Sequence, residues 1–428
     1  MPMKTFLRLL YIIIFSLAFV ACKDDEKATS TDKELRRTVL VYQCAQNSLG
    51  YLNYHRMDSL EIVNGRKYIN DNDCLLVFTD DGRGCARLYR YISGNARPLL
   101  VRLWDHAVNA SDPSMLQEVL IWTREHFTAR EYGLVFWSHA DGWLPSTNTD
   151  YAATRVQSFG IDVGTGGDMH KDRSVGGDIG AQMNIPDLAS AVANSGIHAR
   201  YIFFDACLMQ TLEVAYDLRN VTDYIVASPF STPGYGAYYT HLLRKGLFSN
   251  DPTDIARTFY ADVVEDAEIS PQYDDFGMVI SCLKTEGLEL LAEVTREVLG
   301  RSSLMLHASP DMGDVLHYQS YEADFFYRPH AFDALAAMSH LLSAEDYALW
   351  SNAFSQVLVW HGISSRFWVG PSLNSYFFVN SDLHSGVSMF VPQAVYGTNA
   401  PACPHGDHNK NFRQTAWYAA AGFAQTGW

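Results

Sequence analysis

The sequence is short of basic residues. Its 32 Lys and Arg stand against 48 Asp and Glu, and the formal net charge is −16. No run of Lys or Arg is present to neutralise a phosphate backbone, so we expect no nucleic-acid partner. A Walker loop and a G-x-S-x-G turn are also missing, which argues against a P-loop nucleotide hydrolase and against a serine hydrolase.

Cysteines are few, and none of them are paired at short spacing. They lie at positions 22, 44, 74, 85, 207, 282 and 403. This spacing does not indicate a disulfide framework. If one cysteine is lipidated and one is catalytic, as the next paragraphs predict, five remain, so at least one more thiol should be free.

The chain begins with an apolar run, "LLYIIIFSLAFV", that is too short to span a bilayer comfortably. Lys4 and Arg8 precede it, which is typical of a signal peptide, here residues 1–21. The run ends in "FVAC" and resembles a bacterial lipobox, which implies lipidation of Cys22. The following "KDDE" resembles the export signal of Bacteroidetes lipoproteins. We therefore expect an outer-membrane lipoprotein exposed at the cell surface; the alternative is an ordinary signal peptide with an incidental Cys22.

Beyond a charged tether at 22–36, short runs rich in Val, Ile and Phe alternate with amphipathic segments, which predicts an α/β fold with a mostly parallel sheet covered by helices on both faces. The expected strands lie at 37–44, 74–80, 132–139, 200–207 and 223–229, and the expected helices at 112–127 and 185–196. We place a catalytic domain at 37–250. A C-terminal α+β region, 251–428, should pack against it, with helices at 251–266 and 284–299 and strands at 375–382 and 386–393.

Two of the expected strands end in residues that can carry out chemistry. "GLVFWSH" ends in His139 and "YIFFDAC" ends in Cys207. Ligands bind beyond the carboxyl ends of parallel strands, and a thiol becomes a useful nucleophile when an imidazole can take its proton. The alternative is a cysteine buried as a small apolar residue and a histidine that lies near a strand end by chance.

The sequence around both residues resembles that of the clostripain family, C11, of the caspase-like clan CD. "YGLVFWSHADGW" is similar to the family's histidine block and "FFDACLMQTLEVAYDL" to its cysteine block. "ASPFSTPGYGAYY", "GVSMFVPQ" and "AGFAQTGW" extend the similarity over nearly the whole chain after residue 37. The resemblance implies a caspase-like fold and a cysteine endopeptidase that cleaves proteins or peptides after Arg or Lys. Cys207 would be the nucleophile and His139 the general base.

The resemblance also implies roles for two neighbouring residues. Backbone N–H groups of Ala140 and Cys207 would form the oxyanion hole. Asp205 would lie at the floor of the S1 pocket and pair with the Arg or Lys of the substrate, and strand alternation would put it on the same side as Cys207. Two alternatives for Asp205 are a solvated carboxylate at a strand end and the N-cap of the following helix.

The sequence departs from the family pattern at two positions. Ala140 stands where the family has Gly directly after the histidine, and a positive φ there would cost Ala free energy. Pro229 stands where the family tends to carry an acid. An alternative function is therefore a catalytically inactive lipoprotein that binds peptides or glycans through its nine Trp and twenty-four Tyr residues.

A long glycine-rich segment, 142–184, separates the histidine block from the cysteine block. Relatives often mature by self-cleavage in such a segment, and here it holds Arg155, Lys171 and Arg173. No required cofactor and no metal ligand set are expected. Some family members respond to calcium, which makes calcium a possible cofactor.

Overall fold

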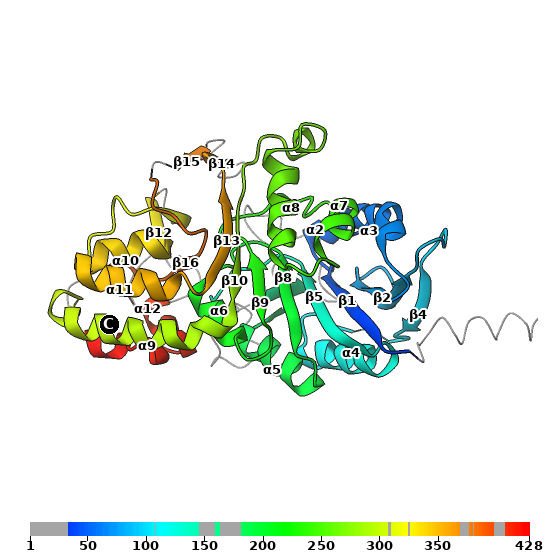
Figure 1. Cartoon of the computed structure of the whole chain (residues 1–428), viewed down its shortest axis with the longest axis horizontal. Coiled ribbons are helices and arrows are strands. Elements are labelled where there is room, and N and C mark those ends of the chain that lie inside the picture. Colours follow the sequence, from blue (N-terminus) through cyan, green and yellow to red (C-terminus); the bar gives the residue numbers. More distant parts are fainter. Residues whose placement is uncertain are drawn as a thin grey trace, which may run out of the picture.

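The computed structural model describes residues 33–106, 108–144, 159–162, 181–306, 310–323, 326–368, 376–379, 381–397 and 407–428. A nine-stranded sheet forms the centre of the molecule (Figure 1). Across the sheet the order is β13 (Leu358–Ile363), β10 (Val279–Lys284), β9 (Tyr224–Ala227), β8 (Ala199–Asp205), β5 (Ala129–Trp137), β1 (Leu35–Cys44), β2 (Asp73–Asp80), β3 (Arg87–Tyr91) and β4 (Leu99–Leu103).

The central strands β9, β8, β5, β1 and β2 are parallel to one another. The strands outside them pair antiparallel on both sides, β10 with β9 and β3 with β2. The central strands are buried on both faces, because Val39 and Leu40, adjacent in β1, belong to two different apolar cores. The mostly parallel α/β sheet predicted from the sequence is therefore confirmed.

Helices cover both faces of this sheet (Figure 1). The core that contains Leu40 also takes apolar residues from α4 (Pro113–His126), α5 (Ile185–Ser195) and α6 (Leu212–Leu218). The core that contains Val39 takes them from α3 (Tyr54–Gly65), α7 (Tyr239–His241), the π-helical turn Leu242–Gly246 and α8 (Thr253–Val264). The two faces of the sheet thus have separate cores.

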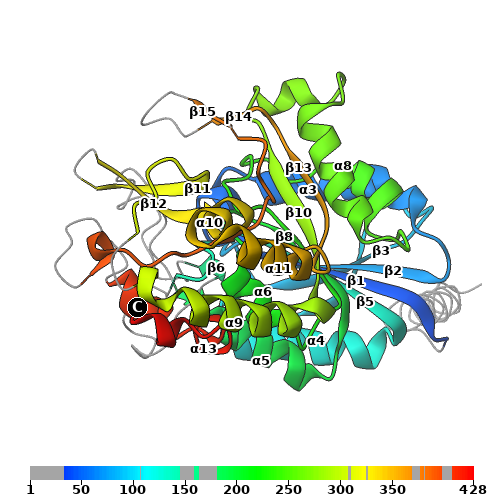
Figure 2. The same ribbon diagram turned by 60° about the vertical axis from the view of Figure 1, so that its left-hand side comes forward.

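The C-terminal region mixes helices and small sheets. Its elements are α9 (Leu288–Leu306), α10 (Ala334–Leu341), α11 (Ala344–Phe354), α12 (His408–Phe412), α13 (Ala416–Ala420), the sheet of β11 (His317–Ala323), β12 (Phe326–Asp333) and β16 (Ser388–Met389), and the pair β14 (Arg366–Trp368) and β15 (Tyr376–Phe378). Figure 2 shows α9, α10, α11 and α13 gathered on one side of the main sheet, apart from α8. This region also supplies β10 and β13 to the main sheet, so the two regions share one sheet.

Five expected strands end earlier than predicted, and three of them, at 223–229, 375–382 and 386–393, are found as β9, β15 and β16. The runs at 132–139 and 200–207 end as strands at Trp137 and Asp205, so His139 and Cys207 lie in the loops that follow. The sequence pattern also missed α3, for a clear physical reason. The helix buries His55 and Asp58 while Met57 and Leu60 are exposed, so it lacks an apolar stripe.

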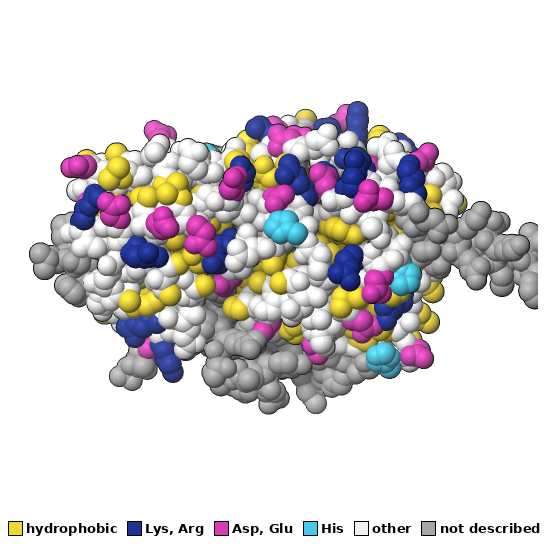
Figure 3. All heavy atoms as spheres, turned by 60° about the horizontal axis from the view of Figure 1, so that its bottom comes forward, with side chains coloured by type: hydrophobic (Ala, Val, Ile, Leu, Met, Phe, Trp, Pro, Cys, Tyr) yellow, Lys and Arg dark blue, Asp and Glu magenta, His cyan; other side chains and the backbone are white. Residues whose placement is uncertain are grey.

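The predicted anchor, comprising the signal peptide and Cys22, lies outside the described residues. Within the described part of the chain, none of the helices has the length and apolar character needed to cross a membrane. The described cysteines Cys44, Cys74, Cys85, Cys207 and Cys282 form no disulfide with one another. On the face drawn in Figure 3, basic and acidic side chains are interspersed; the absence of a nucleic-acid partner stays a prediction.

Candidate active site

Two loops leave the sheet at the same edge: the histidine loop, which follows β5 and carries His139, and the cysteine loop, which follows β8 and carries Cys207. β5 and β8 are neighbouring parallel strands (Figure 1), and Trp137 pairs with Asp205 in their register. His139 and Cys207 each follow two residues after this pair. Because neighbouring strands are about 4.8 Å apart, the register makes the two loops start side by side at the carboxyl edge of the sheet.

The two loops touch at a glycine. Gly142 has a φ of +65°, and a Cβ placed on it would lie 2.7 Å from the carbonyl oxygen of Leu208. Leu208 directly follows Cys207 and itself has a φ of 64°, which is costly for a branched side chain. Its N–H donates to the carbonyl of Phe230 at 3.1 Å. The turn after Cys207 is therefore fixed by contacts from two other segments.

The Cys207 thiol is half-buried and lies against Thr232. The Thr232 N–H donates to Sγ at 3.3 Å, and its hydroxyl lies 3.6 Å from the same atom. Burial raises the pKa of Cys207; the contacts with Thr232 oppose that rise, and the charge of Asp141 adds to it. Since the thiol is less acidic than a free cysteine, forming the thiolate at neutral pH requires a base.

His139 is half-buried and is held by a hydrogen bond from one side. The Ser48 hydroxyl lies 2.9 Å from His139 Nε2. Ser48 opens the short helix α2 (Ser48–Tyr51), whose N-cap Asn47 accepts from the Gly50 N–H at 3.1 Å. The Asn47 amide also donates to the Ser138 hydroxyl at 3.2 Å. This neutral group (Asn47, Ser48, Ser138) joins the end of β1 to the histidine loop.

Ala140 is buried, and it is not among the non-glycine residues with a positive φ. The left-handed position of this loop is Gly142, two residues later. The backbone strain that the sequence suggested for Ala140 is therefore absent. Its part in an oxyanion hole stays a prediction.

Asp205 is only 4% exposed, and its carboxylate, at the end of β8, accepts hydrogen bonds from two residues. The Ala237 N–H donates to Oδ1 at 3.1 Å and to Oδ2 at 3.2 Å, and the Tyr239 hydroxyl donates to Oδ2 at 3.1 Å. The N-cap of α6 is instead Thr211. Both alternatives for Asp205, a solvated carboxylate and a helix cap, are therefore wrong.

Two further acids lie near Asp205, on helix α3. Glu61 accepts the Tyr239 N–H at 2.7 Å, and Asp58 is fully buried. Burial raises the pKa of Asp205 to about 6 and that of Glu61 to about 8, and burial raises the pKa of Asp58 strongly. The Asp205 charge adds to the rise at both α3 acids. Sequence reasoning missed this acidic group (Asp58, Glu61, Asp205), because no pattern connects residues so far apart in the chain.

The C-terminal region supports the segment that follows Cys207. The Ser388 N–H donates to the Gln210 carbonyl at 2.9 Å, and the Phe390 N–H donates to Glu213 Oε1 at 2.9 Å. The Gln210 side chain donates to the Ser281 hydroxyl at 2.8 Å. Residues from β10 and β16 thus hold the start of α6 in place behind the thiol.

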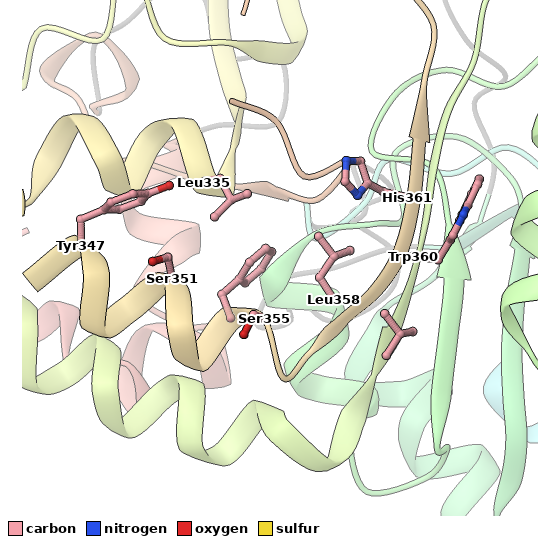
Figure 4. Close-up of a pocket in the computed structure, with 9 residues that line it drawn as sticks. Leu335, Tyr347, Ser351, Ser355, Leu358, Trp360 and His361 are labelled. Atoms are coloured by element: carbon pink, nitrogen blue, oxygen red, sulfur yellow. The ribbon is translucent and has the colours of Figure 1, made fainter. Parts of the chain in front are cut away.

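The hollow drawn in Figure 4 lies away from this edge, between α11 and the outermost strand β13. Its walls include Tyr347, Phe354, Leu358 and Trp360. None of the predicted catalytic residues lines it. Other predicted residues fall outside the described ones, namely Cys22 and the possible self-processing positions Arg155, Lys171 and Arg173.

Solved structures with the same architecture are peptidases. The chain is 28% identical to a secreted C11 cysteine protease from Bacteroides thetaiotaomicron, solved with an irreversible peptide inhibitor, over 91% of this chain and 99% of that one, with a TM-score of 0.72. An inactive zymogen C11 protease from Parabacteroides distasonis is 24% identical over 91% and 99% of the two chains, with a TM-score of 0.70, and supports the fold. No curated protein matches the chain.

The model of the clostripain family, Peptidase C11, matches residues 41–327, which is more than half of the 428 residues. The match includes β5, β8 and the two loops that carry His139 and Cys207. A thiol nucleophile and an imidazole base need no cofactor for peptide hydrolysis. The chain belongs to the clostripain family and is a cysteine peptidase.

Proposed function

We propose that the chain is an endopeptidase that cleaves after Arg or Lys with Cys207 as nucleophile and His139 as base. The supporting observation is the pairing of Trp137 with Asp205, which puts both loops at one edge. His139 takes the thiol proton, and the Cys207 sulfur attacks the carbonyl carbon of the substrate. Backbone N–H groups of Ala140 and Cys207 stabilise the resulting oxyanion.

The reaction then proceeds through a thioester. The tetrahedral intermediate collapses, the C–N bond breaks, and His139 returns its proton to the leaving amine. Water, deprotonated by His139, attacks the thioester and releases the acid product and the free thiol. The peptide inhibitor on the Bacteroides thetaiotaomicron relative supports peptides as the substrate class.

Specificity for a basic P1 residue is assigned to Asp205. The carboxylate lies at the end of β8, two residues before the thiol, and is shielded from bulk water. A charge in such surroundings attracts a guanidinium or ammonium more strongly than an exposed one does. Calcium stays a possible cofactor.

The deciding experiment compares Cys207→Ala with the unaltered enzyme on fluorogenic peptides that carry Arg, Lys, Gln or Ala at P1, with and without calcium. We expect Cys207→Ala to abolish cleavage and leave the circular dichroism spectrum unchanged. Cys85→Ala is the matched control, since Cys85 is the other half-buried cysteine of the described residues. Full turnover in Cys207→Ala would refute the assignment. A folded, unaltered protein without any turnover would favour the non-catalytic, binding alternative.

We also propose that the enzyme is a lipoprotein of the outer membrane, exposed at the cell surface and anchored at Cys22. The proposal is based on "FVACKDDE" in the sequence. Cys22→Ser should move the protein from the membrane fraction to the soluble fraction of the cell. Retention of the variant in the membrane fraction would contradict a lipid anchor.

Self-cleavage near Arg155, Lys171 or Arg173 is the proposed route of maturation. Exposed polar segments are where proteolytic nicking concentrates. An unaltered preparation should contain two chains after storage, and Cys207→Ala should remain a single chain. A fully active enzyme that stays in one piece would remove this idea without affecting the peptidase assignment.

A further inference from the structure

A second group of ligating side chains lies between α7 and α8, on the sheet face that carries the acidic group. His241 ends α7, Asp262 lies on α8, and Asp266 follows this helix. Their candidate ligand atoms all lie within 4.8 Å of one another. His241 Nδ1 is 2.7 Å from Asp262 Oδ1.

The ion pair between His241 and Asp262 leaves one oxygen of the Asp262 carboxylate unexplained. Asp262 is 2% exposed, and its Oδ2 atom has no hydrogen-bond partner among the described residues. A buried carboxylate oxygen without a partner costs free energy. A bound cation would satisfy this oxygen.

The other two side chains are positioned before any ion binds. Asp266 Oδ1 accepts the N–H groups of Glu268 at 2.9 Å and Ile269 at 3.2 Å, which fixes the carboxylate at the end of α8. His241 is held by its contact with Asp262. His241 and Asp266 are both half-buried, so water and ions can reach the group.

Two carboxylates meet in this group, Asp262 on α8 and Asp266 just after it, and their candidate ligand atoms lie within 4.8 Å of each other and of His241. A divalent cation bound between them would pair with both carboxylates at once.

We propose that His241, Asp262 and Asp266 bind one divalent transition-metal ion, with Zn²⁺ as the best match. One imidazole nitrogen and two carboxylate oxygens are ligands that zinc accepts, and water would complete a four-coordinate site. Calcium is a poorer match, since it prefers six to eight oxygen ligands. The site is therefore distinct from the calcium response implied by the family resemblance.

An ion at this site would join α7 to α8. The segment just before His241 contains Ala237 and Tyr239, which donate hydrogen bonds to Asp205. Zinc would thus stabilise the segment that covers the S1 carboxylate. This regulatory consequence depends on the proposed function, whereas metal binding does not.

The test uses tag-free Cys207→Ala protein, so that zinc cannot act through the catalytic thiol and self-cleavage cannot occur. Equilibrium dialysis against ZnCl₂ gives stoichiometry and affinity, and thermal unfolding with and without ZnCl₂ gives stabilisation. His241→Gln and Asp266→Asn, both at half-buried positions, are introduced into this background. The matched control is His198→Gln, since His198 makes a surface pair with Asp223, its Nε2 atom lying 2.8 Å from Oδ1.

We expect one zinc ion in the parent protein and in His198→Gln, with a higher unfolding temperature when zinc is present. His241→Gln and Asp266→Asn should bind zinc at least about tenfold more weakly and lose the stabilisation. Equal affinity in all four proteins, or no zinc bound by the folded parent, would overturn the proposal. Because the parent has no catalytic thiol, this result is independent of whether the peptidase assignment holds.

Discussion

The two loops of the candidate active site are supported by polar groups of different character. The histidine loop is backed by the neutral group Asn47, Ser48 and Ser138. β8 ends at Asp205, which forms the acidic group together with Asp58 and Glu61 of α3. Amides and hydroxyls keep their hydrogen bonds at any working pH. Carboxyl groups with pKa values of about 6 and about 8 change their charge across that range. Orientation of the base should thus be insensitive to pH, and substrate selection should respond to it.

Removal of the base itself should cause the largest change in activity. His139→Ala should lower kcat on an Arg substrate by roughly 10²- to 10⁴-fold, the usual contribution of general acid–base catalysis. The preference for Arg over Gln at P1 should change little, because the acidic group is untouched. Steady-state kinetics on both substrates check this. A large loss of the preference would show that the two groups are not independent.

Asp205→Asn should lower the preference for a basic P1 residue and leave kcat on a neutral substrate nearly unchanged, which is the reverse of the effect of His139→Ala. A charge-assisted hydrogen bond contributes roughly 1.5–3 kcal/mol, which corresponds to about a 10- to 100-fold change in a ratio of kcat/KM values. We expect the preference for Arg or Lys over Gln to fall by that factor. Turnover of the best neutral substrate should stay near its original value. An unchanged ratio in the variant would reject Asp205 as the S1 carboxylate.

The preference for a basic P1 residue should also fall as the pH drops below about 6. Burial raises the pKa of Asp205 to about 6, so the carboxyl is neutral below this pH and charged above it. The measurement is the ratio of kcat/KM for Arg and Gln substrates, because any pH dependence of the catalytic step that both substrates share cancels in this ratio. The ratio should be flat from pH 5 to 7 in Asp205→Asn. In Glu61→Gln, any further rise of the ratio near pH 8 should disappear, because Glu61 titrates there.

The smallest effect is expected for the neutral group. Ser48→Ala removes one hydrogen bond to His139, and such bonds contribute roughly 0.5–1.5 kcal/mol, or about a 2- to 13-fold decrease in kcat. KM and the P1 preference should be unchanged, and Ser48→Thr should restore most of the activity. Ser190→Ala is the control, because Ser190 is exposed and its hydroxyl donates to the Pro186 carbonyl within α5. Equal activity of Ser48→Ala and the control would show that Ser48 does not position the base.

The sequence alone was sufficient for the central sheet. The runs at 37–44 and 74–80 contain the unbroken apolar stretches 39–42 and 74–78. Consecutive apolar residues point to both faces of a strand, which predicts burial on both faces, and the runs are found as β1 and β2. Their alternation with helices requires parallel strands, which places strand ends, and therefore His139 and Cys207, at one edge. Pattern and chain connectivity are local properties, which is why the sequence could determine them.

The surroundings of those residues were decided only by tertiary structure. The sequence allowed three environments for Asp205: a pocket carboxylate, a solvated strand end and a helix cap. Burial of Asp205 excludes the solvated end, and Thr211 as the N-cap of α6 excludes the cap. Ser48 and Glu61 could not be predicted, because each reaches the site from another strand or helix. Hydrogen bonds and burial depend on which segments meet in space, and they set the pKa values. The sequence thus determined which residues stand at the edge of the sheet, and the packing of distant segments determined their protonation and orientation.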